Sequence, residues 1–217
     1  MANIKACLFD LDGVIVDTAG FHFQAWKRLA IELGCDFTEA DNEHLKGVSR
    51  IRSLEMILEW GGRVLGEAEK TACAEKKNEW YLESVMQMTD ADVLPGVQAF
   101  MKVLTKAGIK VALGSASKNA MTILTKIKML DYFDAIVDGV SVSKAKPDPE
   151  VFLKGAEVLG VSPKECVVFE DAQAGVEAAI NAGMHCIGVG QADMLKKADF
   201  VISSFEEMNI ARFQNLK

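Results

Sequence analysis

Several features that would associate this 217-residue chain with a membrane or a nucleic acid are missing from its sequence. No segment approaches the ~18 apolar residues that a membrane-spanning helix requires. The formal net charge is -7, and the 24 Lys and Arg residues are interspersed with the 31 Asp and Glu residues, so no basic stripe is available for a phosphate backbone. The charged and apolar regions of a signal peptide are also missing at the start. We therefore expect neither a membrane nor a nucleic acid among the partners.

Paired cysteines and nucleotide-binding motifs are missing as well. The five cysteines are widely spaced and include no Cys-x-x-Cys pair, which is typical of buried free thiols in a reducing compartment. We expect a cytoplasmic protein on this ground. Neither Gly-x-x-x-x-Gly-Lys-Ser/Thr nor Gly-x-Gly-x-x-Gly occurs, which disfavours an enzyme of nucleoside triphosphates or dinucleotides. Half of the residues are hydrophobic and a quarter are charged, as in a globular protein with a sizeable core.

Two carboxylates end the first apolar run of the chain, in the stretch Ala6-Cys7-Leu8-Phe9-Asp10-Leu11-Asp12-Gly13. The run predicts a buried strand, and because side chains alternate along a strand, Asp10 and Asp12 leave its end on the same side. Two acids so placed repel each other and lose water, an arrangement that usually persists where a cation, a proton or a reaction uses it. For this pair taken alone, a turn or a helix cap is the alternative interpretation.

The spacing of apolar residues changes along the chain. Residues 21–88 show only helical spacing, whereas strand-like and helix-like segments alternate after Pro95-Gly96. Such alternation predicts a parallel sheet that is covered on both faces. We predict an α/β fold in which residues 1–17 and 92–217 form a Rossmann-like core, a parallel sheet with helices on both faces. Residues 18–91 are predicted to form an inserted α-helical cap domain.

Polar residues follow three of the predicted strands, namely Asp10 with Asp12, Ser115 with Ser117, and Glu170 with Asp171. Ligands of parallel sheets bind beyond the carboxyl ends of the strands, so we expect these groups in one crevice. A hard divalent cation would hold such carboxylates together, and Mg²⁺ prefers one or two carboxylates plus water and phosphate oxygens. The thiolates and imidazoles that zinc prefers are not near these strand ends. A calcium-binding EF-hand is excluded. Its loop needs glycine at position six, whereas Gly13 lies at position four when Asp10 is counted as position one.

These residue types together favour phosphoryl transfer. A carboxylate beside Mg²⁺ can act as the nucleophile and form an aspartyl phosphate, with Asp12 then free to serve as general acid and base. Lys146 could supply a cation, and Ser115 with nearby backbone amides could hold phosphate oxygens near a helix N-terminus. Phosphoryl transfer demands little beyond such positioning and charge neutralisation.

The same residues resemble the four motifs of the haloacid dehalogenase superfamily, here Phe9-Asp10-Leu11-Asp12-Gly13-Val14, Ser115, Lys146 and Glu170-Asp171. The resemblance runs from Lys5 to about Gly190, and the helices inserted after the first motif resemble the small helical cap of that superfamily. Its dehalogenases lack the second aspartate of the first motif. Asp12 therefore implies the phosphotransferase branch, with Asp10 as the phosphorylated nucleophile.

Further segments resemble the β-phosphoglucomutase family of that superfamily. They are Asp17-Thr18, His22, Trp26, Leu45-Lys46-Gly47-Val48-Ser49-Arg50, Ser53, Lys77-Asn78 and Gly114-Ser115-Ala116-Ser117-Lys118-Asn119. That family is a group of Mg²⁺-dependent isomerases that interconvert β-D-glucose 1-phosphate and β-D-glucose 6-phosphate through an aspartyl phosphate and β-glucose 1,6-bisphosphate. The resemblance implies these sugar phosphates as the partners, and we expect a monomer.

The resemblance also implies a role for each of these residues. The implied Mg²⁺ ligands are Asp10, Glu170, Asp171 and, through a backbone oxygen, Asp12. The implied contacts of the transferring phosphate are Ser115, Ala116 and Lys146, and those of the second phosphate are Arg50, Ser117, Lys118 and Asn119. The sugar is expected to meet Lys46, Gly47, Val48 and Ser49, with Trp26 and Ser53 as further substrate-binding candidates. The residues implied to link closure of the cap to the position of Asp12 are Thr18, His22 and Lys77.

Other interpretations stay open on the sequence alone. The function could be that of a sugar-phosphate phosphatase of the same superfamily, or that of a non-catalytic binding protein on the same fold. Trp26 could be a core residue of the cap and His22 a solvated helix residue. Lys76 rather than Lys77 could be the functional lysine of its charged helix. The sugar could be glucose or part of a larger glucose 1-phosphate derivative, because the cap loops form its pocket.

Overall fold

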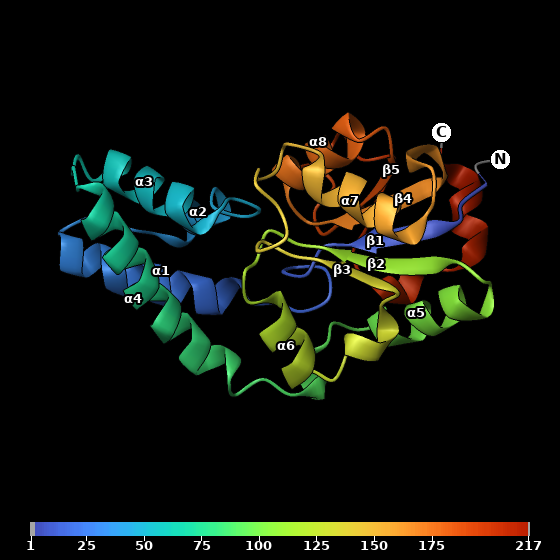
Figure 1. The fold of residues 1–217 in the computed structure, drawn as a ribbon, viewed down its shortest axis with the longest axis horizontal. Coiled ribbons are helices and arrows are strands. Elements are labelled where there is room, and N and C mark those ends of the chain that lie inside the picture. The colour runs from blue at the N-terminus through green and yellow to red at the C-terminus, as the bar shows by residue number, and fades with distance from the viewer. Residues whose placement is uncertain (1–2, 217) are drawn as a thin grey trace.

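A six-stranded parallel sheet forms the core of the protein (Figure 1). The computed structural model describes residues 3–216. The strands are β1 (Ala6–Phe9), β2 (Lys110–Gly114), β3 (Ala135–Val137), β4 (Cys166–Glu170), β5 (His185–Val189) and β6 (Phe200–Ile202). Their order in the sheet is β3-β2-β1-β4-β5-β6, so the strand order reverses beside β1, where parallel sheets bind ligands. The predicted Rossmann-like sheet is confirmed.

The side chains of β1 alternate between two hydrophobic cores. Cys7 and Phe9 belong to one buried cluster, and Ala6 and Leu8 belong to another. The first cluster is covered by α5 (Val97–Lys106) and α6 (Ala120–Lys126), and the second by α7 (Glu150–Leu159) and α8 (Gln173–Asn181). Figure 1 shows the two pairs of helices on opposite sides of the sheet. A strand that is buried on both faces has to be apolar throughout, which is why the apolar run predicted it.

The regular elements of residues 18–91 are helical and lie to one side of the sheet (Figure 1). We call this part the helical lobe; its helices are α1 (Ala19–Leu33), α2 (Glu39–Glu43), α3 (Arg50–Trp60) and α4 (Glu67–Val85). Their apolar sides meet in a cluster of their own that includes Trp26, Leu54 and Ile57. This separate core supports the predicted cap domain, whose boundaries after residues 17 and 91 stay predictions.

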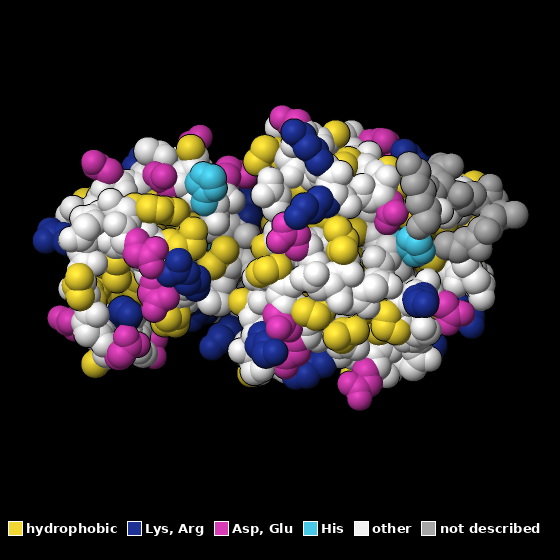
Figure 2. Space-filling view, turned by 90° about the horizontal axis from the view of Figure 1, so that it is seen from above, with side chains coloured by type: hydrophobic (Ala, Val, Ile, Leu, Met, Phe, Trp, Pro, Cys, Tyr) yellow, Lys and Arg dark blue, Asp and Glu magenta, His cyan; other side chains and the backbone are white. Residues whose placement is uncertain are grey.

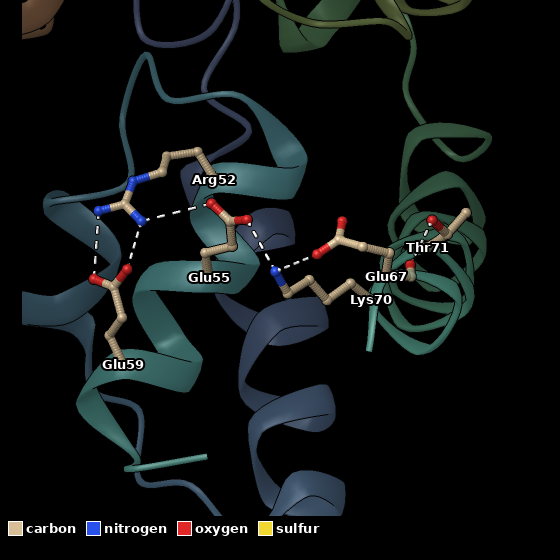
Figure 3. A network of polar contacts seen from close by, with 6 residues as sticks. All are labelled: Arg52, Glu55, Glu59, Glu67, Lys70 and Thr71. Atoms are coloured by element: carbon tan, nitrogen blue, oxygen red, sulfur yellow. Dashed lines mark hydrogen bonds and ion pairs between the residues drawn. The ribbon is translucent and has the colours of Figure 1, made fainter. Parts of the chain in front are cut away.

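A network of ion pairs joins α3 to α4 on the surface of the helical lobe (Figure 3). The guanidinium of Arg52 lies 2.6 Å from Glu59 and 3.6 Å from Glu55. Glu55 also contacts the ammonium of Lys70, near the start of α4, at 3.2 Å. Solvent-exposed pairs of this kind contribute little to stability, so the apolar cluster, rather than the network, holds the two helices together.

Charges of both signs are mixed over the face of the molecule that Figure 2 shows. Lys and Arg side chains alternate there with Asp and Glu side chains and do not gather into a basic stripe. Among the described residues 3–216, no helix combines the length and the apolar character that crossing a bilayer requires.

Candidate active site

Three carboxylates meet at the carboxyl ends of two neighbouring strands. Asp10 directly follows β1, and Glu170 with Asp171 closes β4. The two strands pair in parallel with Phe9 beside Phe169, and the Asp10 amide donates to the Phe169 carbonyl at 3.0 Å. One oxygen from each of the three carboxylates lies within 4.8 Å of the other two. The register of the two strands thus brings distant parts of the sequence together.

Lys146 is buried between two of these carboxylates. Its Nζ lies 2.6 Å from Asp10 Oδ1 and 2.5 Å from Glu170 Oε1, and its side chain is 1% exposed. Burial alone would lower the pKa of Lys146, but Asp10 and Glu170 outweigh burial and raise that pKa. Lys146 is therefore charged at neutral pH and donates charge-assisted hydrogen bonds to both partners.

The three carboxylates carry more negative charge than the lysine between them neutralises. Burial, followed by the charges of Glu170 and Asp10, raises the pKa of Asp171 well above its ordinary value. Glycines leave room for the acids: a Cβ on Gly13, where φ is +79°, would overlap the Asp171 carboxylate, and one on Gly175 would overlap that of Glu170. Clustered carboxylate oxygens are the donors that Mg²⁺ prefers, so these residues fit a divalent cation.

The Asp12 side chain stays outside this cluster and accepts a hydrogen bond from the Thr18 hydroxyl. Thr18 is buried at the start of the helical lobe. Burial, followed by repulsion from Asp10, raises the pKa of Asp12 to about 6. A carboxyl group with a pKa near neutrality can both take and give a proton at physiological pH. The metal contact of Asp12 through its backbone oxygen stays a prediction.

Two bases of the helical lobe lie beside each other, with 2.8 Å between Lys77 Nζ on α4 and His22 Nδ1 on α1. Burial, followed by the charge of Lys77, lowers the pKa of His22 well below its usual value, so the imidazole is neutral. Burial also lowers the pKa of Lys77 to about 7. Lys77 is 2% exposed and lies over the Trp26 ring, 4.5 Å from its centroid. Lys76 instead pairs with Glu32 at the surface, at 2.6 Å.

The loop after β2 presents polar side chains on the core side of the crevice. Ser115 is buried, and its Oγ accepts from the Ser117 amide at 3.1 Å. The Ser117 hydroxyl oxygen in turn accepts from the Asn119 amide at 3.2 Å. The Asn119 side-chain amide donates to Asn78 Oδ1 on α4 at 2.8 Å. The loop therefore makes a direct contact with the helical lobe.

Two cations of the helical lobe, Lys46 and Arg50, line the same cavity as this loop and the carboxylates of Asp10 and Asp171. Lys46 Nζ lies 3.4 Å from Asp171 Oδ2 and 2.9 Å from Glu43 Oε2. Arg50 begins α3 and is half-buried, and within the part of the chain that the structure describes it makes no ion pair. Burial lowers the pKa of Arg50. A partly desolvated guanidinium without a carboxylate partner suits an anionic ligand such as a phosphate.

A cavity of about 590 Å³ lies between the helical lobe and the carboxyl ends of β1 and β2. The predicted site residues that line it are Asp10, Asp12, Thr18, His22, Trp26, Lys46, Gly47, Val48, Ser49, Arg50, Ser53, Lys77, Ser115, Ala116, Ser117, Lys118, Asn119, Lys146 and Asp171. Glu170 does not reach the cavity, because it is buried and bonded to Lys146. Trp26 both lines the cavity and packs in the core of the lobe, so the two interpretations of this residue are compatible.

Sequence reasoning missed part of the face that α4 turns toward the cavity. Thr71, Ala74 and Glu75 line it together with Lys77 and with Asn78, which the sequence analysis named beside Lys77 without a role. Ala74, Glu75 and Asn78 follow Thr71 by three, four and seven residues, which places all four on one side of a helix. The sequence contains this spacing, but α4 carries charges on all sides, so nothing in it indicates which side faces the cavity.

Comparison with known proteins agrees with this geometry. Residues 4–183 match the haloacid dehalogenase-like hydrolases. The chain belongs to this family. Within it, the chain is 43% identical over 209 residues to the β-phosphoglucomutase of Bacillus subtilis strain 168, a match that covers 95% of this chain and 92% of that protein. The resemblance inferred from the motifs is confirmed.

Two further proteins are also similar to this chain along nearly their whole length. The crystal structure of β-phosphoglucomutase from Clostridium difficile superposes with a TM-score of 0.94 at 42% identity, covering 97% of this chain and 96% of that one. A phosphorylated carbohydrates phosphatase of Thermotoga maritima is 30% identical, covering 96% of this chain and 99% of that protein. Mutases and phosphatases are therefore both among the relatives.

Proposed function

We propose that this member of the haloacid dehalogenase-like family is a Mg²⁺-dependent β-phosphoglucomutase that interconverts β-D-glucose 1-phosphate and β-D-glucose 6-phosphate. The observation that carries the proposal is the positive charge on both sides of one cavity. Lys146 and Ser115 lie on the core side with the Asp10 carboxylate, and Arg50 lies on the lobe side. A phosphatase needs a site for one phosphate, whereas a mutase that turns a bisphosphate around needs two. Similarity to two β-phosphoglucomutases supports the same activity.

Asp10 is the nucleophile of the proposed mechanism. Lys146 donates to Asp10 Oδ1 at 2.6 Å, which orients the carboxylate and leaves Oδ2 to attack phosphorus. The O–P bond to Asp10 forms as the O–P bond to the sugar breaks, and Lys146 with Ser115 holds the phosphoryl oxygens. Mg²⁺ bound by Asp10, Glu170 and Asp171 would further neutralise the charge on those oxygens.

Asp12 moves the proton in both directions. Because burial and Asp10 raise its pKa to about 6, both protonation states are accessible near neutral pH. Asp12 takes the proton of the sugar hydroxyl that accepts the phosphoryl group from Asp10. It returns a proton to the leaving sugar oxygen when the bisphosphate gives up its other phosphoryl group. Thr18, together with the His22–Lys77 pair, connects this residue to α1 and α4.

The second phosphate and the sugar occupy the rest of the cavity. Arg50 binds this phosphate through its planar guanidinium. The other proposed contacts of the substrate are Ala116, Ser117, Lys118 and Asn119 after β2, Lys46, Gly47, Val48 and Ser49 before α3, and Trp26 and Ser53 on the helices of the lobe. Enclosure by the lobe excludes water, which would otherwise hydrolyse the aspartyl phosphate.

The organisation and location of the protein are proposed on the same basis. Residues 1–17 and 92–217 form the catalytic core domain, and residues 18–91 form the cap domain. All five cysteines are free and four of them are buried, which fits a reducing cytoplasm. We expect a monomer whose partners are sugar phosphates, without a nucleic acid or a membrane.

A sugar-phosphate phosphatase is the second candidate, because one relative of similar length is a phosphatase and the Asp10–Lys146 centre serves hydrolysis equally well. The half-buried Arg50 favours the mutase, since an enzyme that hydrolyses a single phosphate has no second phosphate for Arg50 to bind. A non-catalytic binding protein is disfavoured, because a cluster of three carboxylates, two of them bonded to a buried lysine, is costly to maintain unless a reaction uses it.

One assay separates these functions. β-Glucose 1-phosphate is supplied with Mg²⁺ and a trace of β-glucose 1,6-bisphosphate, and glucose 6-phosphate and free phosphate are followed together. We expect glucose 6-phosphate with little free phosphate. Release of phosphate without the isomer would refute the mutase, and absence of both products would favour the binding protein. Asp10→Asn, which removes the nucleophile, is the control that must yield neither product.

A further inference from the structure

Tyr81 carries the only fully buried side-chain oxygen among residues 3–216 that has no hydrogen-bond partner. It lies on α4, one turn after Lys77, and is 1% exposed. A buried phenol normally finds a partner, because burying it without one destabilises the fold. The hydroxyl of Tyr81 therefore calls for an explanation other than stability.

The ring of Tyr81 packs against the groups that surround Asp12. Its centroid lies 4.2 Å from that of the His22 ring and 4.8 Å from Lys77 Nζ. Asp12 and Thr18 are also close enough to act on the phenol: burial and then the charge of Asp12 raise the pKa of Tyr81, whereas the Thr18 hydroxyl, which lies within reach of a hydrogen bond to the phenol oxygen, lowers it. Asp12 and Thr18 line the cavity, whereas Tyr81 does not.

The proposed reaction requires Asp12, which accepts from Thr18, to reach a sugar oxygen as well. Thr18 has one hydroxyl proton, which it donates to Asp12 Oδ1. To exchange a proton with the sugar, Asp12 needs an oxygen within hydrogen-bond reach of a sugar oxygen, and a turn of the carboxylate toward the cavity would withdraw Oδ1 from Thr18. Thr18 is fully buried, so water does not replace the lost acceptor. The Tyr81 hydroxyl has no competing partner and is available for this bond.

We propose that the Tyr81 hydroxyl is the alternate hydrogen-bond partner of Thr18, which makes Tyr81 a positioning residue for Asp12. In the resting state Thr18 donates to Asp12, and the phenol has no partner. When Asp12 turns toward the sugar, the Thr18 hydroxyl donates to Tyr81 Oη instead. The exchange avoids a second unsatisfied buried group, so Asp12 can leave Thr18 at little cost. This role of Tyr81 rests on the proposed acid–base role of Asp12.

Tyr81→Phe tests the exchange, because it removes the hydroxyl and keeps the ring against His22. The melting temperature should stay the same or rise by about 2–4 °C, since a buried polar atom without a partner is removed. The kcat for isomerisation should fall about tenfold with KM unchanged, since one hydrogen bond that eases the movement of Asp12 is lost. Tyr132→Phe is the matched control: the other tyrosine of the chain is half-buried and outside the cavity lining, and its variant should keep the wild-type kcat.

Thr18→Val removes the hydroxyl on the other side of the exchange. If Tyr81 acts through Thr18, the double variant Thr18→Val with Tyr81→Phe should lose no more kcat than Thr18→Val alone. Losses that multiply in the double variant would overturn the proposal. An unchanged kcat in Tyr81→Phe would overturn it as well, and so would a lowered melting temperature, because the hydroxyl would then have a partner in the resting state.

Two assays distinguish the failure of the proposed role of Tyr81 from the failure of the proposed mutase function. Each variant is assayed for isomerisation of β-glucose 1-phosphate and for hydrolysis of an alkyl phosphate, whose poor leaving oxygen needs the same proton from Asp12. A wild type that only hydrolyses would refute the mutase function. Tyr81→Phe should slow that hydrolysis all the same.

Discussion

Lys77 Nζ lies 2.8 Å from His22 Nδ1, and this contact joins α4 to α1 close to the Asp12 carboxylate. A charged lysine offers only hydrogen-bond donors, so the neutral imidazole has to accept at Nδ1 and carry its proton on Nε2. Burial disfavours the charge of Lys77, and Asp12 is among the groups that favour it. The charge of Lys77 is therefore linked to that of the Asp12 carboxylate.

Lys77→Met should make the protein more stable, and the gain should depend on pH. Burial lowers the pKa of Lys77 to about 7, far below that of a lysine in an unfolded chain. Between these two pKa values the unfolded chain binds more protons at Lys77, so this group makes the free energy of unfolding of the wild type rise with pH, by at most about 1.4 kcal/mol per pH unit. The penalty is complete below about pH 7 and fades above it. Urea unfolding from about pH 6 to about pH 9 should show the advantage of Lys77→Met shrinking.

Lys76→Met is the matched control for this measurement. Lys76 neighbours Lys77 in sequence but lies at the surface, paired with Glu32. Its variant should follow the wild type across the same pH range. A constant difference between Lys77→Met and the wild type would contradict the lowered pKa of Lys77.

Lys146→Met should destabilise the protein strongly. It leaves the Asp10 and Glu170 carboxylates close together without the cation between them, and breaking a buried pair in this way costs about 3–5 kcal/mol. Mg²⁺ should restore part of the loss, since a cation at the cluster supplies positive charge to the folded state only. Urea unfolding with and without Mg²⁺ measures both effects. The exposed Lys154, 2.7 Å from Glu150, provides the control variant Lys154→Met, and an equal loss there would argue against the buried pair as the cause.

Arg50→Ala should separate isomerisation from hydrolysis. The guanidinium is assigned to the second phosphate, so its removal should lower kcat/KM for β-glucose 1-phosphate isomerisation about 10- to 100-fold, as expected for charge-assisted hydrogen bonds. Hydrolysis of a small phosphate ester should change much less. Arg52→Ala, on the same helix but paired with Glu59 outside the cavity, should affect neither reaction. A parallel loss of both reactions in Arg50→Ala would contradict a second phosphate site.

Gly175→Ala should weaken Mg²⁺ binding. The added Cβ would overlap the Glu170 carboxylate, which has to move away from Asp10 and Lys146. Displacing a group of a metal site typically costs about 10- to 100-fold in affinity. Titration calorimetry with Mg²⁺ measures this loss. Gly20→Ala on α1, where an added Cβ meets nothing within 4 Å, should bind Mg²⁺ like the wild type. An unchanged affinity in Gly175→Ala would exclude Glu170 from the metal site.

Local patterns in the sequence determined the strands and the residues at their ends. The run that became β1 had to be apolar because both faces of the strand are covered, and Asp10 follows it directly. Glu170 and Asp171 close β4 in the same way. Because parallel strands share one carboxyl edge, such residues meet wherever the strands are neighbours, so the acidic cluster could be predicted without a structure.

Only the tertiary structure decided which other side chains lie close to that cluster and to Asp12. Lys146 was predicted as a cation, but its burial between Asp10 and Glu170 depends on how a long loop packs. The rotation of α4 about its axis decides that Lys77 rather than Lys76 is buried beside the cavity. The same rotation brings Tyr81 close to Asp12 and Thr18. That rotation is set by packing against α1 and α3, and a helix charged on all sides does not reveal it.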